Sequence, residues 1–147
     1  MKKVLFICTH NSARSQMAEG LLRAMYGDRY EALSAGTAPT RVSPFSVKAM
    51  QEAGVDISNQ RAKGVEEYTG MQIDYVVTVC DQAKETCPFF PARLKNFHKS
   101  FIDPTSIEGT DEEKLEMFRR VKGDIKSWIE DTFTHQNGVK TSSRQEK

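Results

Sequence analysis

A chain of 147 residues, 38% of them hydrophobic, is long enough to bury the core of one domain. Its 21 basic and 20 acidic residues leave a formal net charge of +1, which excludes a strongly charged surface for nucleic acid or an anionic membrane. No apolar segment approaches the length of a membrane span or resembles a signal peptide, so we expect a cytoplasmic protein. Three cysteines in such a reducing compartment do not predict a structural disulfide framework.

The first predicted element is a buried strand that ends in a cysteine. Residues 4–7 form an apolar run that is too short for a helix and contains β-branched and aromatic side chains. Cys8 ends this run, and small polar residues follow it. A helix comes next, with apolar positions about one turn apart at Ala13, Met17, Leu21 and Met25. Cys8 therefore lies where a strand enters a loop, and Arg14 lies in the first turn of the helix that follows.

This strand–loop–helix unit predicts an anion-binding site. Backbone N–H groups converge at a helix N-terminus, the helix dipole adds positive potential, and Arg14 adds a planar fork that suits a tetrahedral oxyanion. The same field stabilises the thiolate of Cys8 and makes it a nucleophile. The hydroxyls of Ser12 and Ser15 can donate to the sulfur, and Asn11 can adopt a left-handed conformation. The alternative is a buried structural cysteine at a strand end.

Three further strands and two clear helices are predicted along the chain. Strands are expected over 30–34, 75–79 and 94–97, and the second of them ends in Cys80. A helix begins with Pro44 at its first position, and a capping box at 110–113 begins a long amphipathic helix. The buried face of the long helix contains Leu115, Phe118, Val121, Ile125, Trp128 and Ile129. Polar helix formers also occupy 81–86, just before Cys87-Pro88.

Alternating strands and helices predict an α/β fold. We expect a three-layer sandwich with a central, mostly four-stranded parallel sheet and helices on both faces. Residues 1–136 are predicted to form a single catalytic domain, and the polar residues 137–147 a disordered tail. Ligands of such sheets bind at the carboxyl ends of the strands, so Cys8 and Cys80 share one rim if their strands are neighbours.

Cys80 and Cys87 are seven residues apart. In a helix they share a face but stand ~10.5 Å apart along the axis, whereas a disulfide requires Cα atoms within about 7 Å. We hypothesise a redox switch in which oxidation unwinds a short helix between them. The alternatives are two unrelated buried cysteines, or a zinc site with Cys8 and His10, which no CxxC or HxxxH pair supports.

Asp103-Pro104 contains a candidate general acid. Proline fixes the turn, so the carboxyl group can point toward the rim, where partial burial favours its protonated form. The alternative is an ordinary turn aspartate before a proline.

The stretch Cys8–Ser15 resembles the phosphate loop of low-molecular-weight protein tyrosine phosphatases and of the thioredoxin-coupled arsenate reductases built on that fold. The resemblance to the reductases extends over residues 2–133. Its motifs are Cys8, Arg14, Ser15-Gln-Met-Ala-Glu19, Ser34-Ala-Gly36, Asp56-Ile-Ser58-Asn59, Asp74–Cys80, Cys87-Pro88 and Asp103-Pro104.

The resemblance implies a reaction and roles for these residues. Arsenate is expected to bind to the loop, which consists of Thr9, His10, Asn11, Ser12, Ala13, Arg14 and Ser15. Cys8 attacks the arsenate while Asp103 protonates the departing oxygen. Cys80 then attacks Cys8 and releases arsenite, Cys87 attacks Cys80, and thioredoxin reduces the resulting disulfide. No cofactor is implied, and we expect a monomer.

One feature separates this chain from some of its implied relatives. Some of the reductases bind potassium through residues that Asn11, Glu19 and Ser34 match, but Lys63 stands where a further acidic ligand is found, so no metal site is expected.

The alternative function is a phosphatase that hydrolyses phosphate monoesters through a phosphorylated Cys8. Cys80 and Cys87 argue against it, and so does Thr105, where phosphatases usually have an aromatic residue.

Overall fold

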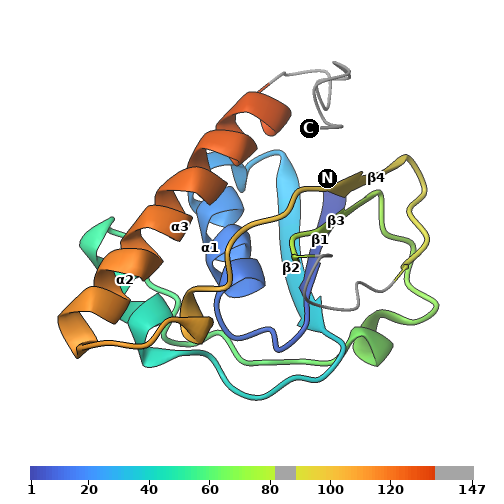
Figure 1. The fold of residues 1–147 in the computed structure, drawn as a ribbon. Coiled ribbons are helices and arrows are strands. Elements are labelled where there is room, and N and C mark those ends of the chain that lie inside the picture. The colour runs from blue at the N-terminus through green and yellow to red at the C-terminus, as the bar shows by residue number, and fades with distance from the viewer. Residues whose placement is uncertain (82–88, 135–147) are drawn as a thin grey trace.

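The computed structural model describes residues 1–81 and 89–134. Its centre is a parallel sheet of four strands in the order β2-β1-β3-β4 (Figure 1). The strands are β1 (Lys2–Cys8), β2 (Tyr30–Gly36), β3 (Tyr75–Thr78) and β4 (Lys95–His98). The predicted α/β fold with a four-stranded parallel sheet is confirmed. Cys87, the segment 82–88 and the tail 137–147 lie outside the described residues, so the predictions made for them are not tested.

Three α-helices cover one face of the sheet (Figure 1). They are α1 (Arg14–Tyr26), α2 (Pro44–Glu52) and α3 (Asp111–Phe133). Each predicted start is confirmed. Ser43 caps α2, which has proline at its first position, and Thr110 and Glu113 form the capping box of α3. The predicted apolar stripe of α3 packs in the main core, with Trp128 partly buried at its edge.

The second face of the sheet has a different cover. Side chains of β1 alternate between the two faces, so Phe6 joins the main core whereas Leu5 and Ile7 join a smaller one. In the described parts of the chain, the single-turn helix η1 (Val65–Tyr68) and irregular segments on either side of β3 cover this smaller core. Helical cover of this face is thus limited to one 3₁₀ turn in these parts.

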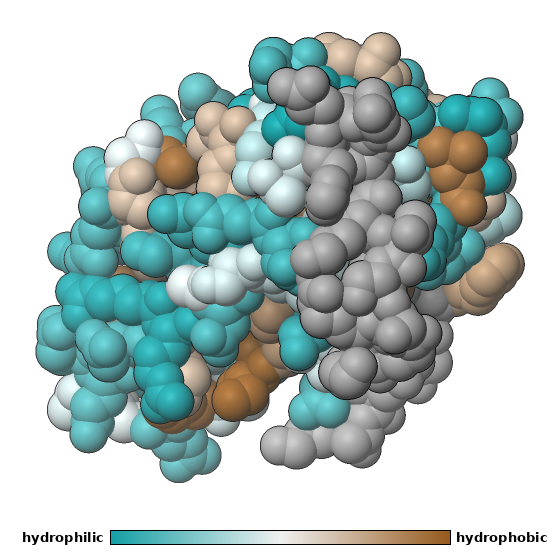
Figure 2. Space-filling view, turned by 90° about the horizontal axis from the view of Figure 1, so that it is seen from above, coloured by the Kyte–Doolittle hydropathy of each residue, from teal (hydrophilic) through white to brown (hydrophobic). Residues whose placement is uncertain are grey.

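One end of the molecule shows the character of its surface. Figure 2 looks onto the end where the strands begin, and its described part is mainly hydrophilic with small separate hydrophobic areas. Within 1–81 and 89–134, none of the helices combines the length and the apolar character that a membrane span requires.

The sheet order decides which sequence segments meet at the functional end. β1 lies between β2 and β3, and Val79 N donates to the Ile7 carbonyl 2.9 Å away, just beyond the paired residues. The strands that carry Cys8 and Cys80 are therefore neighbours, as a shared rim requires.

Candidate active site

The loop from Cys8 to Ser15 is held from outside by the segment that follows β2. Backbone N–H groups of Ala38, Thr40 and Ser43 donate to the carbonyls of Thr9, His10 and Ser12, at 2.8, 3.1 and 3.0 Å. In a trans peptide the N–H group points away from the carbonyl, and the described peptides contain no cis bond. The N–H groups that follow these carbonyls therefore turn toward the inside of the loop, as an anion-binding nest requires.

Asn11 fixes the shape of this loop. It is the single non-glycine residue with positive φ in the described ranges, at 51°, the left-handed conformation that asparagine tolerates. Its fully buried side chain uses every polar atom. The amide nitrogen donates to Ser15 Oγ at 2.7 Å and to Ser34 Oγ at 3.1 Å. The amide oxygen accepts from Gln16 Nε2 at 2.8 Å and from the Lys63 backbone N–H at 2.9 Å.

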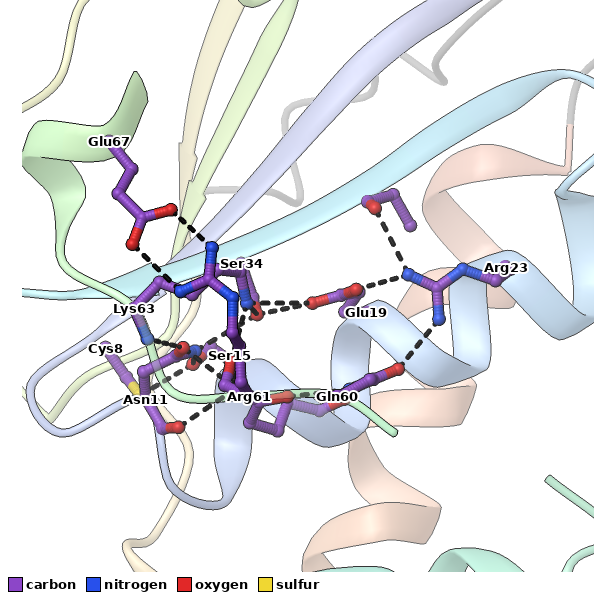
Figure 3. A network of polar contacts seen from close by, with 12 residues as sticks. Cys8, Asn11, Ser15, Glu19, Arg23, Ser34, Gln60, Arg61, Lys63 and Glu67 are labelled. Carbon is purple, nitrogen blue, oxygen red and sulfur yellow. Dashed lines mark hydrogen bonds and ion pairs between the residues drawn. The ribbon is translucent and has the colours of Figure 1, made fainter. Parts of the chain in front are cut away.

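The donors and acceptors of these hydrogen bonds follow one another from Asn11 through Ser15 to the Cys8 sulfur (Figure 3). Ser15 Oγ accepts from the Asn11 amide, so its own proton is available for the Cys8 sulfur 2.8 Å away. A sulfur that accepts a hydrogen bond from a hydroxyl is stabilised in its thiolate form. Cys8 is a buried free thiol at the first position of the loop. This arrangement suits a nucleophilic role for Cys8 beneath an oxyanion held by the loop.

Arg14 and Asp103 meet at the same loop. The Arg14 side chain is only 3% exposed, and its Nη1 donates to the Phe101 carbonyl at 3.4 Å. Its Nη2 lies 3.6 Å from Asp103 Oδ2. The other oxygen, Asp103 Oδ1, accepts from the N–H and hydroxyl groups of Thr105 at the start of the short helix η2 (Pro104–Ser106). Asp103 thus points Oδ2 toward the anion site, which is the geometry that a proton donor requires.

Gly36 lets β2 approach the loop closely. A Cβ atom at this position would stand 2.5 Å from the Thr9 carbonyl oxygen and 2.9 Å from the Asn11 backbone nitrogen. Both neighbours are backbone atoms, so a side chain here would displace the loop. This explains why glycine ends β2.

Cys80 lies at the neighbouring strand end, as predicted. It is fully buried and is disulfide-bonded, whereas Cys8 is not. Its carbonyl accepts from Ser100 Oγ at 3.4 Å, and Ser100 lies 3.1 Å from His98 Nε2. The ring of His98 also contacts Thr78 Oγ1 at 2.7 Å. Burial lowers the pKa of His98, while the charge of Asp81 opposes this shift.

The predicted loop residues differ in what they contribute. The side chain of His10 is exposed, and the residue contributes its backbone carbonyl to the hydrogen bonds that hold the loop. Gln16 and Gln60 were not expected at the site from the sequence. Gln16 is fully buried and bonds to Asn11 and to the Arg61 carbonyl, and Gln60 Nε2 donates to Gln16 Oε1 at 2.6 Å. Polar residues recurring as Gln16, Glu19 and Arg23 along one side of α1 were the available signal.

The polar cluster behind the loop does not fit a bound potassium ion. The Nζ atom of Lys63 lies 3.7 Å from Glu19 Oε1, 3.4 Å from Ser34 Oγ and 2.9 Å from the Arg61 carbonyl. An ammonium group therefore already stands among the oxygens that would coordinate a cation. A second cation there would meet its charge at short range.

A cavity of about 610 Å³ lies beside the loop. Ser12 from the loop and Thr105, which follows the Asp103-Pro104 turn, both line it. Phe45 and Phe118 contribute its apolar wall, and basic side chains, including that of Arg41, contribute charge. Any group attached to an oxyanion in the loop can extend into this space.

Comparison with known proteins agrees with this geometry. The model of the family described as low molecular weight phosphotyrosine protein phosphatase matches residues 3–134. The arsenate reductase of Halalkalibacterium halodurans is 44% identical over 124 residues, which cover 84% of this chain and 89% of that protein. A solved structure of an arsenate reductase in the reduced state has a TM-score of 0.72 at 32% identity, over 88% of this chain and 95% of the other. The thioredoxin-dependent arsenate reductase of Corynebacterium glutamicum has a TM-score of 0.62 at 30% identity, over 88% of this chain and 61% of the other.

Proposed function

Because the chain belongs to the low molecular weight phosphotyrosine protein phosphatase family and has arsenate reductases as its relatives, we infer that it is an arsenate reductase. We propose further that it works through a relay of Cys8, Cys80 and Cys87, and that thioredoxin closes the cycle. The observation that carries the relay is the chain of donors ending on the Cys8 sulfur beside the strand end that bears Cys80.

In the first step, the loop and Arg14 hold arsenate above Cys8. The Cys8 thiolate attacks arsenic and forms a sulfur–arsenic bond, while one oxygen leaves with a proton from Asp103 and departs as water. The closeness of Arg14 Nη2 and Asp103 Oδ2 supports this assignment, since the two groups reach the same ligand from one side.

In the second step, the Cys80 thiolate attacks the Cys8 sulfur. A disulfide forms between them, the sulfur–arsenic bond breaks, and its electron pair reduces arsenic from the +5 to the +3 state, so arsenite leaves. Cys87 then attacks Cys80, which forms the Cys80–Cys87 disulfide and releases the Cys8 thiolate. A thioredoxin dithiol reduces this disulfide and takes its oxidising equivalents.

The cellular compartment and the oligomeric state that we propose follow from the same chemistry. A catalytic thiol that must be free at the start of each cycle suits the cytoplasm, where thioredoxin keeps thiols reduced. One domain over residues 1–136 contains every residue of the proposed relay, so a monomer suffices for the reaction. No cofactor enters any step.

The test is arsenate-dependent NADPH consumption by the purified full chain with thioredoxin and thioredoxin reductase. We expect steady turnover that stops when thioredoxin is omitted. Turnover that continues with glutaredoxin and glutathione alone would contradict the thioredoxin step. No turnover with either system would contradict the reductase function.

A second candidate function is hydrolysis of aryl phosphate monoesters. The cavity beside the loop supports it, because its apolar wall of Phe45 and Phe118 suits an aromatic leaving group. The reaction requires Cys8, Arg14 and Asp103 but not the other two cysteines. Rapid hydrolysis of p-nitrophenyl phosphate without any arsenate turnover would favour this function over the first.

A further inference from the structure

Lys63 is a largely buried cation that the proposed reaction does not use. Its side chain is 11% exposed and that of its partner Glu19 is 8% exposed. Burial lowers the pKa of Lys63, and the charge of Glu19 opposes this shift. A charged group is seldom placed in such surroundings unless its partners hold it there.

The backbone of Lys63 is fixed on two sides. Its N–H group donates to the Asn11 amide oxygen at 2.9 Å, and its carbonyl accepts from Gly36 N at 2.8 Å. The residue thus joins the anion-binding loop to the end of β2.

The ammonium begins a chain of hydrogen bonds that ends on the Cys8 sulfur (Figure 3). Ser34 Oγ accepts from Lys63 Nζ at 3.4 Å and from the Asn11 amide at 3.1 Å. Its single proton therefore goes to Glu19 Oε1, 2.5 Å away. With Ser34 oriented in this way, both protons of the Asn11 amide have acceptors, Ser34 and Ser15. The hydroxyl proton of Ser15 is then left for the Cys8 sulfur.

Lys63 is the cation that faces the inner oxygen of Glu19. Glu19 Oε2 pairs with Arg23 from the same helix, while Glu19 Oε1 faces Lys63 and Ser34. The other charged groups around the ammonium are Arg61 and Glu67, which pair with each other nearer to the surface. Without Lys63, the inner oxygen of Glu19 keeps its hydrogen bond from Ser34 but loses the nearby positive charge of the ammonium.

We propose that the Lys63 ammonium is a built-in cation that orients the hydrogen-bond chain ending on Cys8, so that Lys63 is a positioning residue for the nucleophile. The ammonium stands among oxygens of Glu19, Ser34 and Arg61, so no separately bound cation has to fill that place. The inference deepens the proposed function, since it rests on Cys8 as the attacking group.

The test measures the rate of Cys8 alkylation by iodoacetamide against pH in the full chain, with the Cys8 peptide resolved by mass spectrometry. Lys63→Met is expected to raise the pH midpoint by about one unit, because it removes the positive charge that orients the chain. Lys63→Arg keeps the charge and is expected to restore most of the native midpoint. Lys48→Met, the same change at an exposed lysine of α2, is the matched control and leaves the midpoint unchanged. A native midpoint in folded Lys63→Met overturns the proposal.

A second variant covers the case in which Lys63→Met does not fold. Ser34→Ala leaves every charge in place but removes the hydroxyl that connects the ammonium to Asn11. We expect Ser34→Ala to raise the pH midpoint of Cys8 alkylation, as Lys63→Met does. In a folded double variant, adding Lys63→Met to Ser34→Ala is expected to change the midpoint very little further. An unchanged midpoint in Ser34→Ala overturns the proposal.

The salt dependence of Cys8 alkylation in the native chain is an independent test of the proposal. Profiles in potassium chloride and in tetramethylammonium chloride of equal ionic strength are expected to coincide. A midpoint that shifts with potassium means that the cation is not built in, and it overturns the proposal. Since arsenate takes part in none of these measurements, failure of the reductase function and failure of this inference are seen separately.

Discussion

Glu19 and Asp74 are both buried carboxylates that pair with an arginine, but their hydrogen bonds lead to different parts of the molecule. Glu19 connects through Ser34 and Asn11 to the Cys8 sulfur. Asp74 lies at the start of β3, accepts from the Lys3 backbone N–H at 2.8 Å, and faces Arg93 at 2.6 Å. The hydrogen bonds of Asp74 connect the beginnings of neighbouring strands and lead to no reactive side chain.

The difference shows that a buried charge does not by itself mark a functional site. At the carboxyl end of the sheet, the cluster around Glu19 ends on a nucleophile. At the amino end, the contacts of Asp74 end on backbone and on a half-exposed arginine, below a mainly hydrophilic surface (Figure 2). We therefore expect changes at the carboxyl end to alter activity, and changes at the amino end to alter stability alone.

The largest effect is expected for Cys8→Ser. A hydroxyl of similar size keeps the packing but is not ionised near neutral pH, so arsenate turnover falls to the background rate. The measurement is thioredoxin-coupled NADPH consumption, with thermal unfolding as the control for folding. Arsenate reduction that persists in this variant would remove Cys8 from the mechanism.

Cys80→Ser and Cys87→Ser are expected to separate the steps of the relay. Each stops multiple turnover of arsenate, while cleavage of p-nitrophenyl phosphate, which requires neither thiol, stays largely intact. Both activities are measured on the same preparation, so the ester serves as the internal control. If either variant turns over arsenate at the native rate with thioredoxin, the proposed relay is wrong.

Asn11→Ala is expected to have a smaller effect at the same end. It removes the four hydrogen bonds of a buried side chain and the residue type that tolerates positive φ. We expect a loss of ~1.5–3 kcal/mol of transition-state stabilisation, so kcat/KM falls about 10- to 100-fold. Steady-state kinetics of arsenate reduction measure this loss. A native kcat/KM in a folded variant would show that the loop keeps its shape without the asparagine.

Asp74→Asn is expected to leave kcat/KM unchanged and to lower the free energy of unfolding by about 1–2 kcal/mol at neutral pH. Burial raises the pKa of Asp74, but the Lys3 N–H and Arg93 outweigh it, and the net pKa lies below the ordinary value of 3.8. The stabilisation by the ionised carboxylate is therefore complete above about pH 3.8 and is lost as the pH falls through the lower folded-state pKa.

Urea unfolding of the native chain and of Asp74→Asn at several pH values tests this window. The difference between the two is expected to be constant near neutral pH and to shrink below about pH 4. Glu19→Gln provides the matching change at the other end of the sheet and should lower activity. A loss of activity in Asp74→Asn as large as that in Glu19→Gln would contradict the division between the two ends.

Much of the fold was predictable because its causes are local. The apolar run before Cys8, the proline at the start of α2 and the capping box of α3 each act within a few residues of chain. The left-handed conformation of Asn11 belongs with them, because a loop that bends over a helix N-terminus favours a residue that tolerates positive φ. The cover of the second face was harder to predict, since single-turn and irregular segments have no periodicity.

The site was predictable only in part. Cys8 and Arg14 follow from one contiguous unit, and Cys80 follows from the end of a second apolar run. Asp103 follows from the Asp-Pro turn together with the resemblance. Gln16 and Gln60 were missed, because a glutamine on a helix or in a loop is normally a solvated side chain. Only the meeting of α1 with the loop at 60–63 buries them together.

The sequence by itself determined where the three α-helices begin, the approximate positions of the four strands, and which thiol stands at a helix N-terminus. It also determined that the net charge is close to zero. Those properties depend on residues close together in the chain. The tertiary structure decided that β1 and β3 are neighbours and that Lys63 stands behind the loop. It also decided that the Ser34 hydroxyl accepts a hydrogen bond from the Asn11 amide. These are contacts between distant segments, and they form only when the sheet order has placed those segments side by side.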